Sequence, residues 1–432
     1  MRSAFWAELR RSPLRWWLPV LALVNVAVMA SDQGWAGAWP RASAEALRPV
    51  VFLGPLVAAG AAWSAARSGL PGVSDRMRST ARVGWMPDAA QLASSAVIGL
   101  VGYLTGVAYA AFASVAQAGP GFLWPGYLLL GAAATAACAA IGHIAGRVTG
   151  SRFGAPVAAG GGCLILMMAL SSLLGLTENG NAVGGDPAFA VKPVALDTRL
   201  LLGLGLTATA VTLPSLFGLR AGRWRPELQR WSAGAVGVAV VAAAAALMPT
   251  QQVLQERAAP TAPDCTATVP RICLWPEDHF YLKDVTALAV RAGQLPPGLR
   301  VPAAFYEQGV KADDSSGFSL DFGSVSDNMW FVASAMAYNV MSSTFGPKAC
   351  FPSSMSQISY DKMQQSGLLL VQWLSTRIFG GPQPSTVFGG PPGVDPTAIG
   401  RLAKEPEAAQ AAFVRTQATV QDKYLCKAHA QR

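Results

Sequence analysis

Long apolar runs separated by short basic segments constrain the fold of this chain more than any other feature. Only 13% of its residues are charged, against about 25% in ordinary soluble proteins. A membrane-spanning helix needs about 20 mostly apolar residues, and residues 1–249 hold seven runs near that length. The runs are approximately Trp16–Ala30, Val50–Ala66, Leu92–Ala116, Gly126–Ala145, Ala155–Leu176, Leu200–Gly218 and Trp231–Met248. They predict an all-α membrane bundle of about seven transmembrane helices.

Basic residues are divided unequally between the segments that alternate along this predicted bundle. The N-terminal segment and the segments after the second, fourth and sixth runs hold 14 arginines, whereas the alternate set holds 4 Lys and Arg residues. Basic segments stay in the cytoplasm, so we expect a multi-pass plasma-membrane protein with a cytoplasmic N-terminus and an external C-terminus. The arginines do not gather into one basic face, so membrane lipids, and no nucleic acid, are the expected surroundings.

The first apolar run has two interpretations. Its basic start, its apolar stretch and Val28-Met29-Ala30 resemble a secretory signal peptide with a cleavage site. The tryptophans Trp6, Trp16 and Trp17 favour a retained helix, because Trp anchors spans at the membrane interface. Either interpretation leaves the predicted orientation of the other runs unchanged.

The C-terminal region has a different composition. Residues 251–432 contain 15 basic and 15 acidic residues, whereas residues 1–250 contain 18 and 9. We expect a linker over residues 250–264 and a soluble α/β domain, mostly helical, over residues 265–432. The pattern predicts strands at Arg271–Trp275 and Phe318–Phe322, a helix start at Pro276, helices at Asn328–Met341 and Asp361–Phe379, and one or two closing helices over Thr397–His429.

Four cysteines lie in this C-terminal region, namely Cys265, Cys273, Cys350 and Cys426. An even number of cysteines in a domain expected outside the cell predicts disulfides. Four cysteines allow three pairings, and closeness in sequence favours Cys265–Cys273 and therefore Cys350–Cys426. Free thiols or zinc binding is the alternative, although the spacings do not match common zinc modules.

The sequence offers little that points to catalysis. The apolar runs contain no charged residue, which argues against an ion-driven transporter. Within them, His143 is expected to be a satisfied or water-facing side chain, and Asn25 a helix–helix hydrogen-bonding group. Adjacent Glu277, Asp278 and His279 lack the second histidine, one turn away, that a helical zinc site needs. We therefore expect no enzyme and no catalytic, cofactor or metal residues. Many Gly and Ala residues in the runs make a homodimer a possible assembly.

Three segments carry a family resemblance: Glu8–Trp17, Ala65–Leu70 and Arg78–Trp85. Residues 1–250 resemble the permease subunits of type-2 ABC exporters of the kind found in actinobacteria. The C-terminal region is similar to extracytoplasmic domains appended to such permease-like proteins, through Cys273-Leu-Trp-Pro-Glu277 and a late helix that ends near a Cys. Family permeases usually have six spans and a cytoplasmic end, so the seventh run and the external domain depart from the family pattern.

The resemblance implies a function for the bundle. Cytoplasmic ABC ATPase subunits would bind a docking loop after the second run, and the permease itself would hydrolyse no ATP. The candidate docking loop carries Asp75, Arg76, Arg78, Arg82 and Asp88. A topogenic role for these arginines is the alternative. The alternative function is a non-transporting, membrane-anchored protein whose outer domain binds a peptide, lipid or cell-wall ligand.

Overall fold

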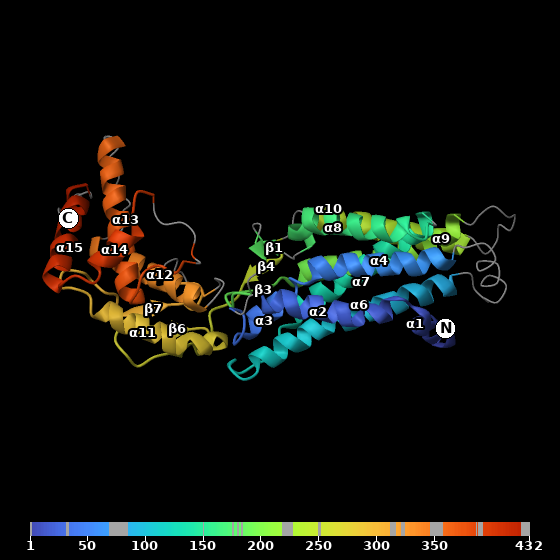
Figure 1. Cartoon of the computed structure of the whole chain (residues 1–432), viewed down its shortest axis with the longest axis horizontal. Helices are drawn as coiled ribbons and strands as arrows, with labels where there is room; N and C mark the ends of the chain where they lie inside the picture. The colour runs from blue at the N-terminus through green and yellow to red at the C-terminus, as the bar shows by residue number, and fades with distance from the viewer. Residues whose placement is uncertain are drawn as a thin grey trace. The chain divides into compact units, whose positions relative to one another are not determined.

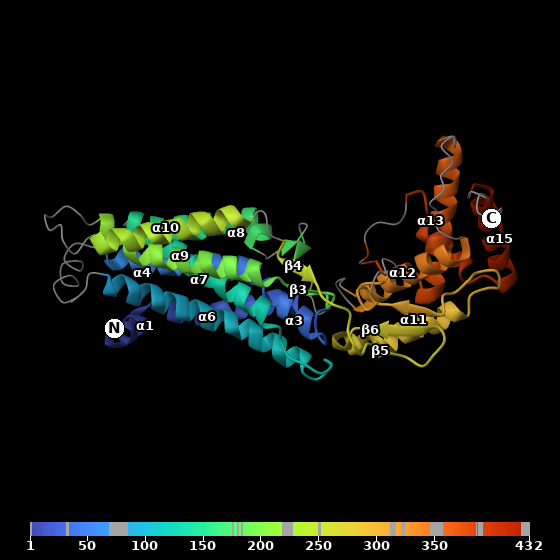
Figure 2. The same ribbon diagram turned by 180° about the vertical axis from the view of Figure 1, so that it is seen from behind.

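The structure is a computed structural model and it describes two compact units (Figure 1 and Figure 2). The described residues are 2–31, 34–68, 85–149, 151–174, 177–178, 181–182, 185–217, 228–248, 252–311, 317–320, 325–345, 357–385, 387 and 392–424. The first unit comprises Met1–Gln117, Gly121–Gly185 and Phe189–Gln255. The second comprises Ala118–Pro120, Asp186–Ala188 and Glu256–Arg432. Each unit is described below by itself.

The first unit is a helical bundle. Its helices are α1 (Arg2–Arg11), α2 (Leu14–Ala30), α3 (Trp39–Glu45), α4 (Val50–Ser68), α6 (Met86–Ser114), α7 (Pro125–Thr149), α8 (Gly154–Leu174), α9 (Pro193–Phe217) and α10 (Leu228–Leu247). Two short strand pairs accompany them: β1 (Thr177–Glu178) with β2 (Asn181–Ala182), and β3 (Phe189–Val191) with β4 (Leu254–Glu256). A helix covers most of each predicted apolar run.

Several of these helices are long and apolar enough to cross a membrane. Four segments of the described chain meet the requirement alone: Trp39–Arg67, Met86–Ser114, Pro125–Thr149 and Pro193–Thr212. The pair Ala4–Arg11 and Leu14–Ala30, bent by 64° at Pro13, makes a fifth if it is one span. The apolar stretches Gly154–Ala169 and Ala235–Leu247 are shorter. The bundle is consistent with a membrane protein, and the number seven stays a prediction.

Helix α4 lies at the centre of the packing in the bundle. It contacts α2, α6, α7 and α8, while α9 packs on α7 and α10 (Figure 1). Leu53 and Val57 of α4 belong to one buried cluster with Tyr103 of α6 and Leu130 of α7. Apolar contact of this kind does not drive helices together within lipid, so close fit and interhelical hydrogen bonds carry the association.

Two helices begin earlier than predicted. Helix α6 begins at Met86 and α9 at Pro193, because proline is well suited to the first turn of a helix. These extensions bring Asp88 into α6, and Asp197 and Arg199 into α9. The predicted apolar runs contain no charged residue, but the helices that cover them extend to charged residues at their ends.

The second unit combines a small sheet with helices. The strands are β5 (Asp264–Cys265), β6 (Arg271–Leu274) and β7 (Ala304–Tyr306), in that spatial order, with β6 antiparallel to β5 and parallel to β7. The helical segments are η2 (Pro276–Tyr281), α11 (Leu282–Gly293), α12 (Val325–Phe345), α13 (Gln357–Phe379), α14 (Pro396–Leu402) and α15 (Glu407–Tyr424). The unit is mostly helical, like the whole described chain.

A single apolar core holds this unit together. Val285, Leu288 and Ala292 recur on one face of α11 with helical spacing, and they pack with Ile272 of β6 and Trp373 of α13. Burial of such side chains contributes about 1.5–3 kcal/mol each.

Two predicted features of the C-terminal region differ from the structure. Phe318, where a strand was predicted, makes only an isolated bridge to Glu307, and the last two residues of that predicted strand lie outside the described residues. The predicted linker contains β4, whose neighbour Val253 is buried and accepts a hydrogen bond from the backbone N–H of Lys192 at 2.8 Å. Backbone pairing therefore orders a segment whose polar sequence predicted a free linker.

Candidate functional site

A buried ionic cluster joins two helices of the bundle. The Oδ1 atom of Asp88 lies 3.1 Å from Nε of Arg147 and 3.5 Å from Nε2 of His143. The side chains of Asp88 and His143 are 7% and 1% exposed, and that of Arg147 is 19% exposed. Ionisable groups are costly in an apolar bundle, and those that occur there usually serve a function.

Local sequence explains how each member reaches the cluster. Pro87 stands at the start of α6, so Asp88 falls in its first turn, where the helix dipole favours an acidic side chain. His143 and Arg147 lie four residues apart near the end of α7 and therefore on the same face. The dipole at this end of α7 favours a cation such as Arg147.

The backbones of α7 and α4 approach closely beside this cluster. A Cβ atom added to Gly142 would lie 2.1 Å from the carbonyl oxygen of Ala58, and one added to Gly146 would lie 2.3 Å from that of Ala62. Small residues four positions apart allow this packing in membrane helices. His143 sits between the two glycines, so the close packing fixes its position next to Asp88.

The cluster has hydrogen-bonding capacity that the described residues leave unused. Neither ring nitrogen of His143 makes a hydrogen bond within the described part of the chain. The arrangement can stabilise a helix junction and can accept a further polar partner. Among the described residues, no three His, Cys, Asp or Glu side chains gather to hold a metal ion.

Of the five predicted docking residues, the structure describes only Asp88. Asp75, Arg76, Arg78 and Arg82 lie outside the described residues. Asp88 is described, and it is a buried member of the cluster rather than an exposed counter-charge. The segment between α4 and α6 therefore ends three residues before a side chain that is tied to α7.

Two cysteines of the second unit form a disulfide. Cys265 of β5 and Cys273 of β6 are direct partners across the antiparallel strands, and a bond joins their sulfur atoms. This is the pairing that sequence proximity favours. Cys350 and Cys426 lie outside the described residues, so their predicted pairing remains a prediction.

The acidic residues near Cys273 do not converge on one site. Glu277 pairs with Arg257 at 3.0 Å, and Asp278 is fully buried. The imidazole of His279 is 59% exposed and pairs with Asp264 on β5. Each of these three side chains is thus directed to a different neighbourhood, as adjacent positions at a helix start generally are.

A polar cleft lies among α13, α14 and α15 of the second unit. Its volume is about 570 Å³, and Arg377, Lys404 and Glu405 line it. Gln410 also lines the cleft and is 2% exposed, and its Oε1 accepts no hydrogen bond from the described residues. Near the end of α13, the Nε of Arg291 donates to the carbonyl of Ile378 at 2.6 Å, and burial lowers the pKa of this arginine.

Comparisons with protein family models, with curated proteins and with solved structures find no match to this chain.

Proposed function

We propose that this chain is a permease-like membrane subunit of an ATP-driven exporter, with ATP hydrolysed by a separate cytoplasmic ABC ATPase. The apolar helices, the distribution of basic residues and the resemblance to type-2 exporter permeases support this proposal. The N-terminus and the segment between α4 and α6 face the cytoplasm in this proposal, and the second unit faces outward.

The link between Asp88 and α7 is the observation that carries the proposal. The candidate docking segment, residues 69–88, comprises the chain between α4 and α6 and the first residues of α6. Both of these helices are tied to α7, one by backbone packing at Gly142 and the other by the pair of Asp88 with Arg147. An ATPase that moves this segment would displace α4, α6 and α7 together instead of bending one loop.

A conformational change needs an element with two discrete arrangements. The ionic cluster suits that role, because Arg147 is partly exposed and can exchange Asp88 for water or for a partner's carboxylate. Closure of the ATPases would be the event that biases the exchange.

Co-purification tests the proposal directly. The full chain is extracted from its own host in mild detergent, and an ABC ATPase is expected to accompany it in stoichiometric amount. Changing Arg76, Arg78 and Arg82 together to Ala should remove the ATPase. The matched control changes Arg220, Arg223 and Arg225 to Ala, which removes the same charge from a different predicted cytoplasmic segment. Recovery of the chain with no ATPase would refute the proposal.

The cleft of the second unit favours a second candidate function, a membrane-anchored protein whose outer unit binds a peptide, lipid or cell-wall ligand. A buried amide oxygen that accepts no hydrogen bond from the described residues, inside a charged cleft, is suited to receive an N–H or O–H group. A photoreactive residue at Gly381, which lines the cleft, should then capture a ligand in cells, whereas one at exposed Val290 should not.

A further inference from the structure

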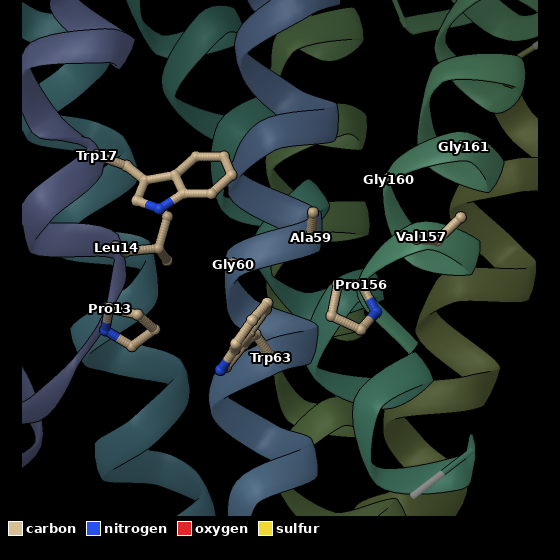
Figure 3. A pocket seen from close by; sticks show the side chains of 10 residues that line it. All are labelled: Pro13, Leu14, Trp17, Ala59, Gly60, Trp63, Pro156, Val157, Gly160 and Gly161. Atoms are coloured by element: carbon tan, nitrogen blue, oxygen red, sulfur yellow. The ribbon is translucent and has the colours of Figure 1, made fainter. Parts of the chain in front are cut away.

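An apolar groove opens on the surface of the bundle between α2, α4 and α8 (Figure 3). Its volume is about 390 Å³. The lining includes Pro13, Leu14, Trp17, Trp63, Pro156 and Val157, and none of the lining side chains is charged. Figure 3 shows the indole rings of Trp17 and Trp63 and the side chain of Val157 at this groove, each from a different helix.

Glycines create the space of the groove. Gly160 and Gly161 of α8 line the wall opposite α2. A Cβ added to Gly160 would lie 3.3 Å from the Cβ of Ala59, so this glycine lets α8 pack closely on α4. A Cβ added to Gly161 would meet no atom within 4 Å, so the volume beside it is open. Gly60 on α4 lies against Leu14, where an added Cβ would come within 2.4 Å of that side chain. Helices α2 and α4 therefore pack closely at Gly60, whereas the space beside Gly161 of α8 is open.

The surroundings of the groove are those of a surface that faces lipid. On α2, Trp16 is 74% exposed, and on α8, Val157 and Ile165 are 76% and 70% exposed. Large apolar side chains with this exposure are expected on a membrane span and costly in water. Tryptophans near one end of a bundle also mark the level of the lipid headgroups.

Two arginines lie close in sequence to lining residues of α4 and α8. Arg152 comes four residues before Pro156. Arg67 follows Trp63 by four residues on α4, and its guanidinium reaches the carbonyl of Arg11 at 3.3 Å. Arg15 of α2 instead stacks its guanidinium on Trp16 and lies on a different face of the helix from Trp17. Arg15 and Arg152 are both exposed.

Acidic residues do not balance these charges. Among the described residues of 2–31, 50–68 and 151–174, Glu8 is the one acid, and its side chain is largely buried. The end of the groove is therefore strongly positive. A guanidinium group pairs well with a phosphate, through several parallel hydrogen bonds.

We infer that this groove binds one acyl chain of an anionic phospholipid of the surrounding bilayer, with the lipid phosphate held by Arg67 and Arg152. The uncharged groove accounts for the chain, and the arginines account for the headgroup. Basic pockets between membrane helices on the cytoplasmic side select anionic headgroups on the same principle. A zwitterionic lipid such as phosphatidylcholine also fits the groove and carries a phosphodiester, but its quaternary ammonium offsets that charge and is repelled by the arginines.

Lipid co-purification tests this site in the full chain. The protein is reconstituted in vesicles of phosphatidylglycerol and phosphatidylcholine in equal amounts and is then extracted in mild detergent. Mass spectrometry measures both retained lipids per protein. The wild-type chain should retain phosphatidylglycerol in clear excess. Gly161→Leu should fill the groove and lower this retention, whereas Gly162→Leu should not, because Gly162 is equally open but lies outside the groove.

Arginine variants test the headgroup separately. Arg67→Gln and Arg152→Gln should each lower the excess of phosphatidylglycerol by about fivefold, as expected for loss of one basic residue near an anionic headgroup. Arg48→Gln, which removes one positive charge near the opposite end of α4, is the control. Equal retention of both lipids by the wild-type chain, or an unchanged excess in Gly161→Leu, would overturn the inference. A dimer that Gly161→Leu dissociates would also overturn it, since a second copy would then be the occupant.

Discussion

The carboxylate of Asp88 lies 3.1 Å from Nε of Arg147, and this pair joins the first turn of α6 to the last turn of α7. The N-terminal end of one helix thereby meets the C-terminal end of the other. The helix dipoles favour the acid at the first position and the base at the second. The ion pair and the two charge–dipole interactions at the helix ends therefore all stabilise this junction.

Asp88→Asn should weaken this junction. The substitution keeps the size of the side chain and removes its charge, so Arg147 loses the carboxylate that neutralises it. Breaking one partner of a buried pair costs about 3 kcal/mol. The apparent melting temperature of the detergent-solubilised chain should fall, and a thermal shift assay with a thiol-reactive or intrinsic fluorescence signal measures it.

The control for this substitution is Asp197→Asn, because Asp197 is an exposed acid in the first turns of α9. It should leave the melting temperature almost unchanged. In the double variant Asp88→Asn with Arg147→Gln, the losses should be less than additive, since both changes remove one interaction. Additive losses would mean that the two side chains do not stabilise each other.

The helices that meet at this junction can be predicted from the sequence, but the ion pair between them cannot. The apolar runs predict the helices of the bundle well, because a run of that length has few other structures in lipid. Met86-Pro87-Asp88 also carries a helix-start pattern that places α6 earlier than the apolar run begins. The pairing of Asp88 with His143 and Arg147 depends on how α6 and α7 pack, and no local pattern in the sequence contains that information.

Gly142→Ala should disrupt the packing of α7 on α4. The new methyl group would lie 2.1 Å from the carbonyl oxygen of Ala58, so the two backbones must separate. Overpacking of a well-fitted interface costs about 1–3 kcal/mol, and a backbone atom yields less readily than a side chain. Melting temperature and yield of folded chain in detergent are the measurements.

Gly162→Ala is the matched control for Gly142→Ala, because an added Cβ at Gly162 meets no atom within 4 Å. Both changes raise helix propensity equally. A stable Gly142→Ala variant together with a stable control would show that α4 and α7 do not approach this closely.

Asn25→Ala should loosen the contact between α2 and α6. The amide Nδ2 of Asn25 is buried and donates to the carbonyl oxygen of Gly102 at 2.7 Å, which is the interhelical role expected from its place in an apolar run. Hydrogen bonds between membrane helices contribute about 1 kcal/mol. Ser31→Ala removes only a bond within the end of α2 and should have no effect on this contact. Cysteine cross-linking between α2 and α6 would report the difference, and equal cross-linking in both variants would contradict the assignment.

The C-terminal region, residues 251–432, was more predictable in its elements than in their pairing and packing. Strand β6, helix α12 and helix α13 follow from local patterns of apolar and turn residues. Strand β4 could not be predicted, because Leu254–Glu256 is polar and pairs with β3 across more than sixty residues of chain. The cleft residue Gln410 carries no local signal either, since its burial comes from the packing of α15 on α13.

Replacing Cys265 and Cys273 together by Ala should destabilise the second unit. The bond closes a loop with a sequence separation of 8, and cross-links of this size stabilise by about 2–3 kcal/mol, mainly by restricting the unfolded chain. Proteolysis of the full chain in increasing urea should show cleavage within residues 256–424 at a lower concentration, with the first unit unaffected. The matched control is Cys163→Ala, which removes a buried free thiol of the first unit. Unchanged cleavage of the double variant would mean that the disulfide does not form in cells. It would also remove the support that this bond gives to an oxidising, external location for the second unit.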